Sequence, residues 1–184
     1  MSQLELLRLV LEALNAVGAE SMLFGSHAAA FHGEVRSTPD VDLVVDLPEE
    51  QTSSFIARFD RHRFYLSESA FAERRMANVI DTFTGDKVDL FFLQTDAEAQ
   101  REFRRRVRGE IMGIEVDVMT VEDTIVSKLR WDAKIGGSEL QRQDILGLVA
   151  TCRDSIDWDY VWANIDGDIR ETLQMIVRAE ENGR

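Results

Sequence analysis

The sequence of 184 residues contains a single cysteine, Cys152, so an internal disulfide is excluded and a reducing cytoplasmic location is expected. It also lacks a cluster of Cys and His at metal-ligand spacing, which argues against a zinc site. A long apolar run is missing from the beginning of the chain, where charged residues interrupt the apolar positions of residues 2–14. This stretch therefore has the pattern of neither a signal peptide nor a membrane span, and we expect no membrane partner.

Basic residues are in short supply. The chain has 21 Lys and Arg against 34 Asp and Glu, a net charge of −13, which argues against a protein that coats nucleic acids. Residues 58–108 nevertheless hold eleven of the 21 basic residues against nine acids. A basic run in this stretch consists of Arg101, Arg104, Arg105, Arg106 and Arg108. It has two interpretations: the solvent-exposed end of a helix, or a surface that binds the phosphates of an RNA acceptor.

The order of the expected elements predicts an α+β fold, because strands crowd the first two thirds of the chain and helices fill the last third. We expect an α/β core over residues 1–119, with a mixed sheet flanked by helices, and a helical portion over residues 120–184. The patterns predict strands at 19–24, 41–47, 63–66, 78–83 and 87–93, and a last strand or a hairpin at 111–118, with Gly113 as a turn or bulge. They predict helices at 2–17, 26–32, 48–59, 96–106, 120–134, 139–152, 158–165 and 169–179, and a short helix or loop at 67–77.

Paired carboxylates on one predicted strand suggest a metal site. Asp40 and Asp42 alternate with apolar residues, so both point to the same side, with their Cα atoms roughly 6–7 Å apart. Mg²⁺ prefers carboxylate oxygens, and two or three aspartates suffice to hold it. A third acid is expected on a neighbouring strand, where Asp89 and Asp117 both lie among apolar residues.

Gly25 and Ser26 follow a short apolar run and precede a stretch of small residues. A glycine lets the backbone approach phosphate closely, and backbone N–H groups at the start of a helix, with the Ser26 hydroxyl, can bind phosphate oxygens. Together with the paired acids, this turn predicts a site for a metal-bound polyphosphate.

This combination resembles the signature of the nucleotidyltransferase superfamily of the DNA polymerase β type: apolar-Gly-(Gly/Ser), a spacer, then Asp-apolar-(Asp/Glu). Thirteen residues separate Ser26 from Asp40, within the spacer range that the family tolerates. The fuller motif is most similar to that of the abortive-infection type IV toxin–antitoxin nucleotidyltransferases (AbiEii-like) and their small relatives. It consists of His32-Gly33, Arg36, Thr38 and Asp40-Val41-Asp42. Later segments extend the resemblance over most of the chain: residues 121–129 resemble the family's Pro-Glu-Asp-Leu-Ile…Lys-Leu segment, with Val121 replacing proline, and residues 142–145 its Arg-x-Asp element.

The resemblance implies roles for particular residues. It selects Asp89, which follows the Gly85-Asp86-Lys87 turn, as the third metal ligand beside Asp40 and Asp42. It places Arg36 and Thr38 beside the nucleotide, with Arg36 either binding triphosphate or pinning the loop to a nearby acid. It makes Lys128 a nucleotide or phosphate contact, and Asp144 either a residue that supports the contacting side chains or a general base. The alternatives are a solvated helix face for Lys128 and an ion pair between helices for Asp144.

The implied activity is transfer of NMP from an NTP to an acceptor hydroxyl with release of pyrophosphate, using Mg²⁺ or Mn²⁺. The resemblance leaves the acceptor open among tRNA, a protein and a small molecule, and it suggests a toxin with an antitoxin partner. The alternative is a protein that retains the fold as a nucleotide-binding or protein-interaction module without turnover.

Overall fold

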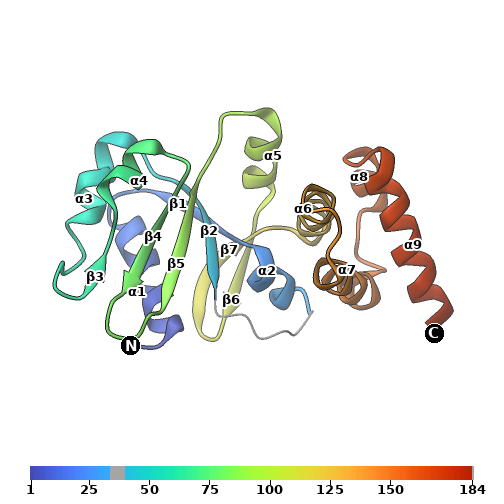
Figure 1. Cartoon of the computed structure of the whole chain (residues 1–184), viewed down its shortest axis with the longest axis horizontal. Coiled ribbons are helices and arrows are strands. Elements are labelled where there is room, and N and C mark those ends of the chain that lie inside the picture. Colours follow the sequence, from blue (N-terminus) through green and yellow to red (C-terminus); the bar gives the residue numbers. More distant parts are fainter. Residues whose placement is uncertain (34–39, 184) are drawn as a thin grey trace. The chain divides into compact units, whose positions relative to one another are not determined.

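The computed structural model describes residues 1–33 and 40–183, and confirms an α+β fold with a mixed sheet flanked by helices. The chain divides into two compact units. Described residues 1–24 and 40–118 form the first, which holds the sheet, and 25–33 with 119–183 form the second, which is helical (Figure 1). The region after residue 120 is helical as expected, and the second unit also takes in the short helix that follows residue 24.

The first unit is built on a seven-stranded sheet of order β3-β4-β5-β2-β1-β7-β6 (Figure 1). Its strands are β1 (Glu20–Phe24), β2 (Val41–Asp46), β3 (Phe64–Tyr65), β4 (Met76–Asp81), β5 (Lys87–Phe92), β6 (Val107–Ile111) and β7 (Ile114–Val118). Its helices are α1 (Gln3–Asn15), the 3₁₀ helix η1 (Glu49–Gln51), α3 (Thr52–Ile56), α4 (Glu68–Glu73) and α5 (Ala97–Arg105).

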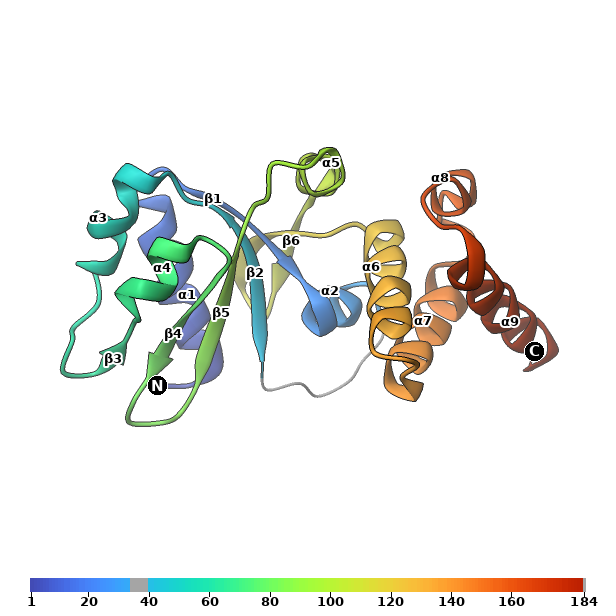
Figure 2. The ribbon, with the colours of Figure 1, turned by 45° about the horizontal axis from the view of Figure 1, so that its top comes forward.

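The centre of the sheet is β2, which pairs antiparallel with β1 and parallel with β5 (Figure 2). Val41, Leu43 and Val45 are fully buried, while the alternate residues of the strand are partly buried or exposed. Helix α1 contacts β1 and β5, and α4 contacts β4. One face of the sheet is therefore core, and the opposite face of β2 carries Asp42, Val44 and Asp46, at the period of two expected of a strand.

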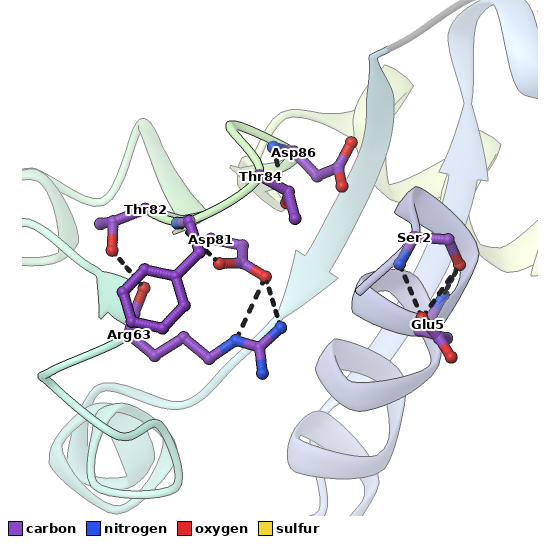
Figure 3. A network of polar contacts seen from close by, with 8 residues as sticks. Ser2, Glu5, Arg63, Asp81, Thr82, Thr84 and Asp86 are labelled. Carbon is purple, nitrogen blue, oxygen red and sulfur yellow. Dashed lines mark hydrogen bonds and ion pairs between the residues drawn. The ribbon is translucent and has the colours of Figure 1, made fainter.

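Local capping sets the beginning of α1. The Ser2 side chain accepts from the Glu5 backbone N–H, and the Glu5 carboxylate accepts from the Ser2 N–H at 2.6 Å, a reciprocal capping box (Figure 3). The bond from the Ser2 N–H, followed by a bond that the Ser2 hydroxyl donates to the same carboxylate at 3.2 Å, lowers the pKa of Glu5. The helix ends before Gly18, whose φ of 71° suits a residue without a Cβ.

An ion pair between the partly exposed Arg63 and a buried carboxylate joins the beginning of β3 to the β4–β5 hairpin. The fully buried Asp81 accepts from Arg63 Nε at 3.2 Å and Nη2 at 2.8 Å, and the Thr82 hydroxyl donates to the Arg63 carbonyl (Figure 3). The hydrogen bond from Arg63 is the main cause that lowers the pKa of Asp81, and the same bond raises the pKa of Arg63. Asp81 shares its side of β4 with the buried Ala77 and Val79, so this pair lies on the core face.

The second unit packs its helices around an apolar cluster. They are α2 (Gly25–Phe31), α6 (Val121–Lys134), α7 (Glu139–Cys152), α8 (Trp158–Ala163) and α9 (Gly167–Gly183). The largest fully buried residues of the cluster include Ile125 and Leu129. His32 Nε2 bonds to the Met119 carbonyl at 2.7 Å, and Cys152 Sγ donates to the His32 carbonyl at 3.0 Å. Burial raises the pKa of the Cys152 thiol, in keeping with a packing role.

Two elements differ from the sequence prediction. Pro48 was expected to begin a helix through residue 59, but it precedes η1 and the five-residue α3. The hairpin interpretation of residues 111–118 holds, since β6 and β7 pair antiparallel on either side of Met112 and Gly113. Strand β6 begins earlier than predicted, at Val107, because the exposed Arg108 and Glu110 give it no apolar alternation. Strands β4 and β5 form a hairpin, and the Asp96 side chain caps the beginning of α5. In the described residues, none of the helices combines the length and apolar character needed to cross a bilayer.

Candidate active site

Two of the predicted carboxylates are direct neighbours in the sheet. Asp42 of β2 pairs in parallel register with Asp89 of β5, so both side chains project from the same face. This is the face opposite to the buried Val41, Leu43 and Val45. Asp42 is partly buried, Asp89 is buried, and Asp40 lies exposed immediately before β2. The sheet thus brings together acids that are 47 positions apart in the sequence.

Asp89 is held by two side chains that the sequence prediction did not include. Lys87 Nζ donates to Asp89 Oδ2 at 2.7 Å, and Asn78 Nδ2 donates to Asp89 Oδ1 at 2.7 Å. The hydrogen bond with Asp89 is the main cause that raises the pKa of Lys87. The same ammonium lies 3.4 Å from Asp40 Oδ1. The signals that could have found these residues are the two-residue spacing of Lys87 and Asp89 and the pairing of Asn78 with Asp89 across the hairpin.

The donor set suits a divalent cation, although the described residues contain no group of three His, Cys, Asp or Glu side chains already gathered as metal ligands. Oxygens of Asp40 and Asp89 surround one cationic nitrogen, which stands where a cation is electrostatically favoured. Carboxylate oxygens are the ligands that Mg²⁺ prefers. Asp40, Asp42 and Asp89 could therefore hold the metal, and their role as ligands stays a prediction.

The alternative third acid, Asp117, lies in a different environment on β7. Its Oδ2 accepts from Arg106 Nε at 3.2 Å, and its Oδ1 accepts from Arg108 Nη1 at 3.3 Å. Arg106 also pairs with Glu20, and Arg108 with Glu115. Strand β1 separates β7 from β2, whereas Asp89 lies directly beside Asp42, so the strand order favours Asp89 as the third ligand. The ion pairs of Arg106 and Arg108 show that part of the basic run faces acids of this chain.

The predicted phosphate-binding turn follows β1 directly. Phe24, the last residue of that strand, pairs with Asp42, and Gly25 comes next in the chain. Gly25 begins α2 with a φ of 69°, a left-handed conformation that favours glycine. Ser26 is partly buried in the first turn of this helix. Arg36 and Thr38, the other predicted contacts of this region, lie outside the described residues.

The second unit brings Lys128 and Asp144 together. Lys128 Nζ of α6 donates to Asp144 Oδ2 of α7 at 2.7 Å and to Gln141 Oε1 at 3.3 Å. The side chains are 5% and 2% exposed. An ion pair between helices, one of the two interpretations of Asp144, is therefore what the structure shows. Arg142 pairs with Asp132 instead. A contact of Lys128 with a nucleotide phosphate stays a prediction.

No protein-family model matches this sequence, and no curated protein matches it significantly. Solved structures do. An antigenic nucleotidyltransferase-like protein from Paracoccidioides brasiliensis superposes with a TM-score of 0.59 at 18% identity, covering 96% of this chain and 93% of that one. The antibiotic-resistance factor ANT(2'')-Ia gives 0.60 at 16% identity, covering 98% and 96%. The fold is that of the nucleotidyltransferases.

A further nucleotidyltransferase-fold structure is the lincosamide antibiotic adenylyltransferase LnuA, determined with lincomycin bound. It gives a TM-score of 0.52 at 10% identity and covers 76% of this chain and 91% of that one. At these identities the likeness establishes the fold, and the chemistry has to be argued from the residues of this chain. The abortive-infection subtype stays a prediction from the sequence motif.

Proposed function

We propose that this protein is a nucleotidyltransferase that transfers NMP from an NTP to an acceptor hydroxyl and releases pyrophosphate. The observation that carries the proposal is the parallel register of Asp42 and Asp89 on one face of a nucleotidyltransferase-fold sheet. Two neighbouring carboxylates on a polar sheet face, with a third two residues away, are what metal-assisted phosphoryl chemistry requires. Mg²⁺ or Mn²⁺, when bound, would supply charge stabilisation for the attacking and leaving oxygens.

In this reaction the residues of the chain would have the following roles. Asp40, Asp42 and Asp89 would hold the cation, and one of these carboxylates would accept the proton of the acceptor hydroxyl. The acceptor oxygen forms a bond to the α-phosphorus while the bond from that phosphorus to the bridging oxygen breaks, and pyrophosphate leaves. Gly25 and Ser26 bind the phosphates, with Arg36, Thr38 and Lys128 assisting and Asp144 orienting Lys128.

The acceptor stays open among a small molecule, tRNA and a protein. Small hydroxylated acceptors are supported by two structural neighbours, ANT(2'')-Ia in complex with adenylyl-2"-tobramycin and LnuA with lincomycin. The motif resemblance to abortive-infection toxins supports a macromolecular acceptor and an antitoxin partner. A toxin role on a cellular acceptor would show itself as slowed growth of a bacterial host that expresses the wild type.

The deciding variant is Asp42→Asn, which keeps the side chain's size and removes a charged oxygen. Changes to residues behind metal ligands typically lower metal affinity or activity by about 10–100-fold, so loss of a ligand should lower transfer by at least about 100-fold. The assay incubates the protein with each labelled NTP, Mg²⁺ or Mn²⁺, and total RNA, proteins or hydroxylated antibiotics. Thermal unfolding checks that the variant is folded.

Asp46→Asn is the matched control. Asp46 lies four residues further along the same strand, on the same face, and is exposed. The Asp46→Asn variant should keep wild-type transfer. In the strand register Asp46 lies beside Glu20 of β1, and it has no neighbouring carboxylate on β5. If wild type and Asp42→Asn label acceptors equally and affect growth equally, the catalytic proposal is wrong and a nucleotide-binding or interaction module takes its place.

A further inference from the structure

The candidate metal site already contains a cation of its own. Lys87 Nζ lies 2.7 Å from Asp89 Oδ2 and 3.4 Å from Asp40 Oδ1. One ammonium group thus joins two of the three carboxylates that the proposed function assigns to a metal. Because Asp89 is only 6% exposed, its charge would be costly without a partner. The lysine balances it when no metal is bound.

The position of Lys87 follows from the strand. Residues 87 and 89 of β5 face the same way, so the lysine stem runs along the face that carries Asp89. The Lys87 side chain is 37% exposed, which leaves its ammonium a route into solvent. Asp89 does not depend on the lysine for its orientation, because Asn78 Nδ2 fixes its Oδ1 at 2.7 Å. The carboxylate can therefore stay in place while the ammonium moves.

An ammonium and a divalent cation would compete for these carboxylates. Both are attracted to the same negative oxygens, and two positive centres a few ångströms apart repel each other strongly. Resting on the proposed function for the use of these carboxylates, we propose that Lys87 is the resident counter-cation of the site and that a divalent metal binds by displacing it. Lys87 then has two effects: it lowers the affinity of the site for metal, and it stabilises the protein when no metal is bound.

The test uses Lys87→Met, which keeps most of the stem and removes the charge. Thermal unfolding is followed in chelator, and binding of Mn²⁺ alone or Mg²⁺ alone is measured by calorimetric titration. The metal-free variant should melt below the wild type, because Asp89 has lost its cation. The same variant should bind metal at least about tenfold more tightly, the size expected when a hydrogen bond to a charged group no longer has to be broken.

Arg63→Met is the matched control, since it removes a cation from another buried aspartate, Asp81, on the core face of the same sheet. It should lower the melting temperature and leave the affinity for metal unchanged. Lys87→Arg keeps the charge and should not bind metal more tightly than the wild type. Lys87→Gln, which can still donate a hydrogen bond to Asp89, serves if Lys87→Met fails to fold, and it should also bind metal more tightly.

The outcomes separate this proposal from the proposed function. Equal metal affinities in the wild type and in the uncharged variants, with NMP transfer by the wild type intact, would overturn the role of Lys87 alone. Tighter binding in Arg63→Met as well would also overturn it, because the gain would then reflect general loosening. Absence of metal binding and of transfer in every protein would overturn both proposals.

Discussion

Two lysines of this protein donate to buried aspartates at the same distance, 2.7 Å, in contrasting surroundings. Lys87 in the sheet unit is 37% exposed and reaches a second carboxylate, whereas Lys128 in the helical unit is 5% exposed and reaches the Gln141 amide. The length of an ion pair therefore says little about its role. The exposure of the cation decides whether it can be exchanged for another partner without disturbing the fold around it.

The largest effect on stability is expected from Lys128→Met. Removing one partner of a buried ion pair typically costs about 3–5 kcal/mol of unfolding free energy, and Lys87→Met should cost less because water reaches its ammonium. Urea unfolding of both variants in chelator measures the difference. If both variants lost the same unfolding free energy, the exposure of the lysine would not distinguish the Lys87 pair from the Lys128 pair.

Lys128→Arg tells structural and nucleotide-binding roles apart. It keeps the positive charge, so it should recover part of the stability that Lys128→Met loses. If Lys128 contacts phosphate, the folded arginine variant should still bind an NTP more weakly than the wild type, because the planar guanidinium cannot reproduce the position of the ammonium. Unchanged nucleotide affinity in a stable variant would limit Lys128 to its pair with Asp144.

A middle-sized effect is expected from Asn78→Ala, which sharpens the description of the sheet unit. The variant removes the 2.7 Å hydrogen bond to Asp89 Oδ1 and leaves Lys87 in place. Hydrogen bonds to charged groups contribute about 1.5–3 kcal/mol, and we expect a loss of that size in urea unfolding. An unchanged unfolding midpoint would mean that Asp89 does not depend on Asn78, and that Lys87 alone fixes its position.

The smallest effect is expected at acid pH, from the Arg63–Asp81 pair. The folded state lowers the pKa of Asp81, so the stabilisation is fully present above the ordinary aspartate value of about 4 and is lost as the pH falls through the lowered value. The difference in stability between wild type and Arg63→Met should therefore shrink between about pH 5 and pH 2 in urea unfolding. A gap that stays constant over this range would show that Asp81 does not titrate differently in the folded protein.

The sequence carried enough information to predict Asp42 and Asp89 as neighbours. The alternation around Asp42 gives its face, and apolar residues on both sides of Asp89 mark a buried strand in which a lone acid needs a partner. The partners themselves could not be predicted. Asn78 meets Asp89 only through the pairing of β4 with β5, and that register is set by the hairpin as a whole.

The sequence also could not predict that α2 packs in the helical unit. Its residues follow β1 directly, and a short run of small side chains gives no clue to which surface it packs on. The contacts that settle the matter join distant positions: His32 bonds to Met119, and Cys152 donates to His32 across 120 residues. Sequence patterns report local structure and not tertiary contacts, so they give no sign that His32 and Cys152 are partners.

The two outermost strands of the sheet have a consequence for self-association. An open edge offers unpaired backbone groups to any strand of another molecule, and proteins guard such edges with short strands or with charge. Strand β3 at one end has only two residues. Strand β6 at the other end exposes Arg108 and Glu110, so an incoming strand would have to bury both charges. Both edges of the sheet thus discourage the addition of strands from another molecule.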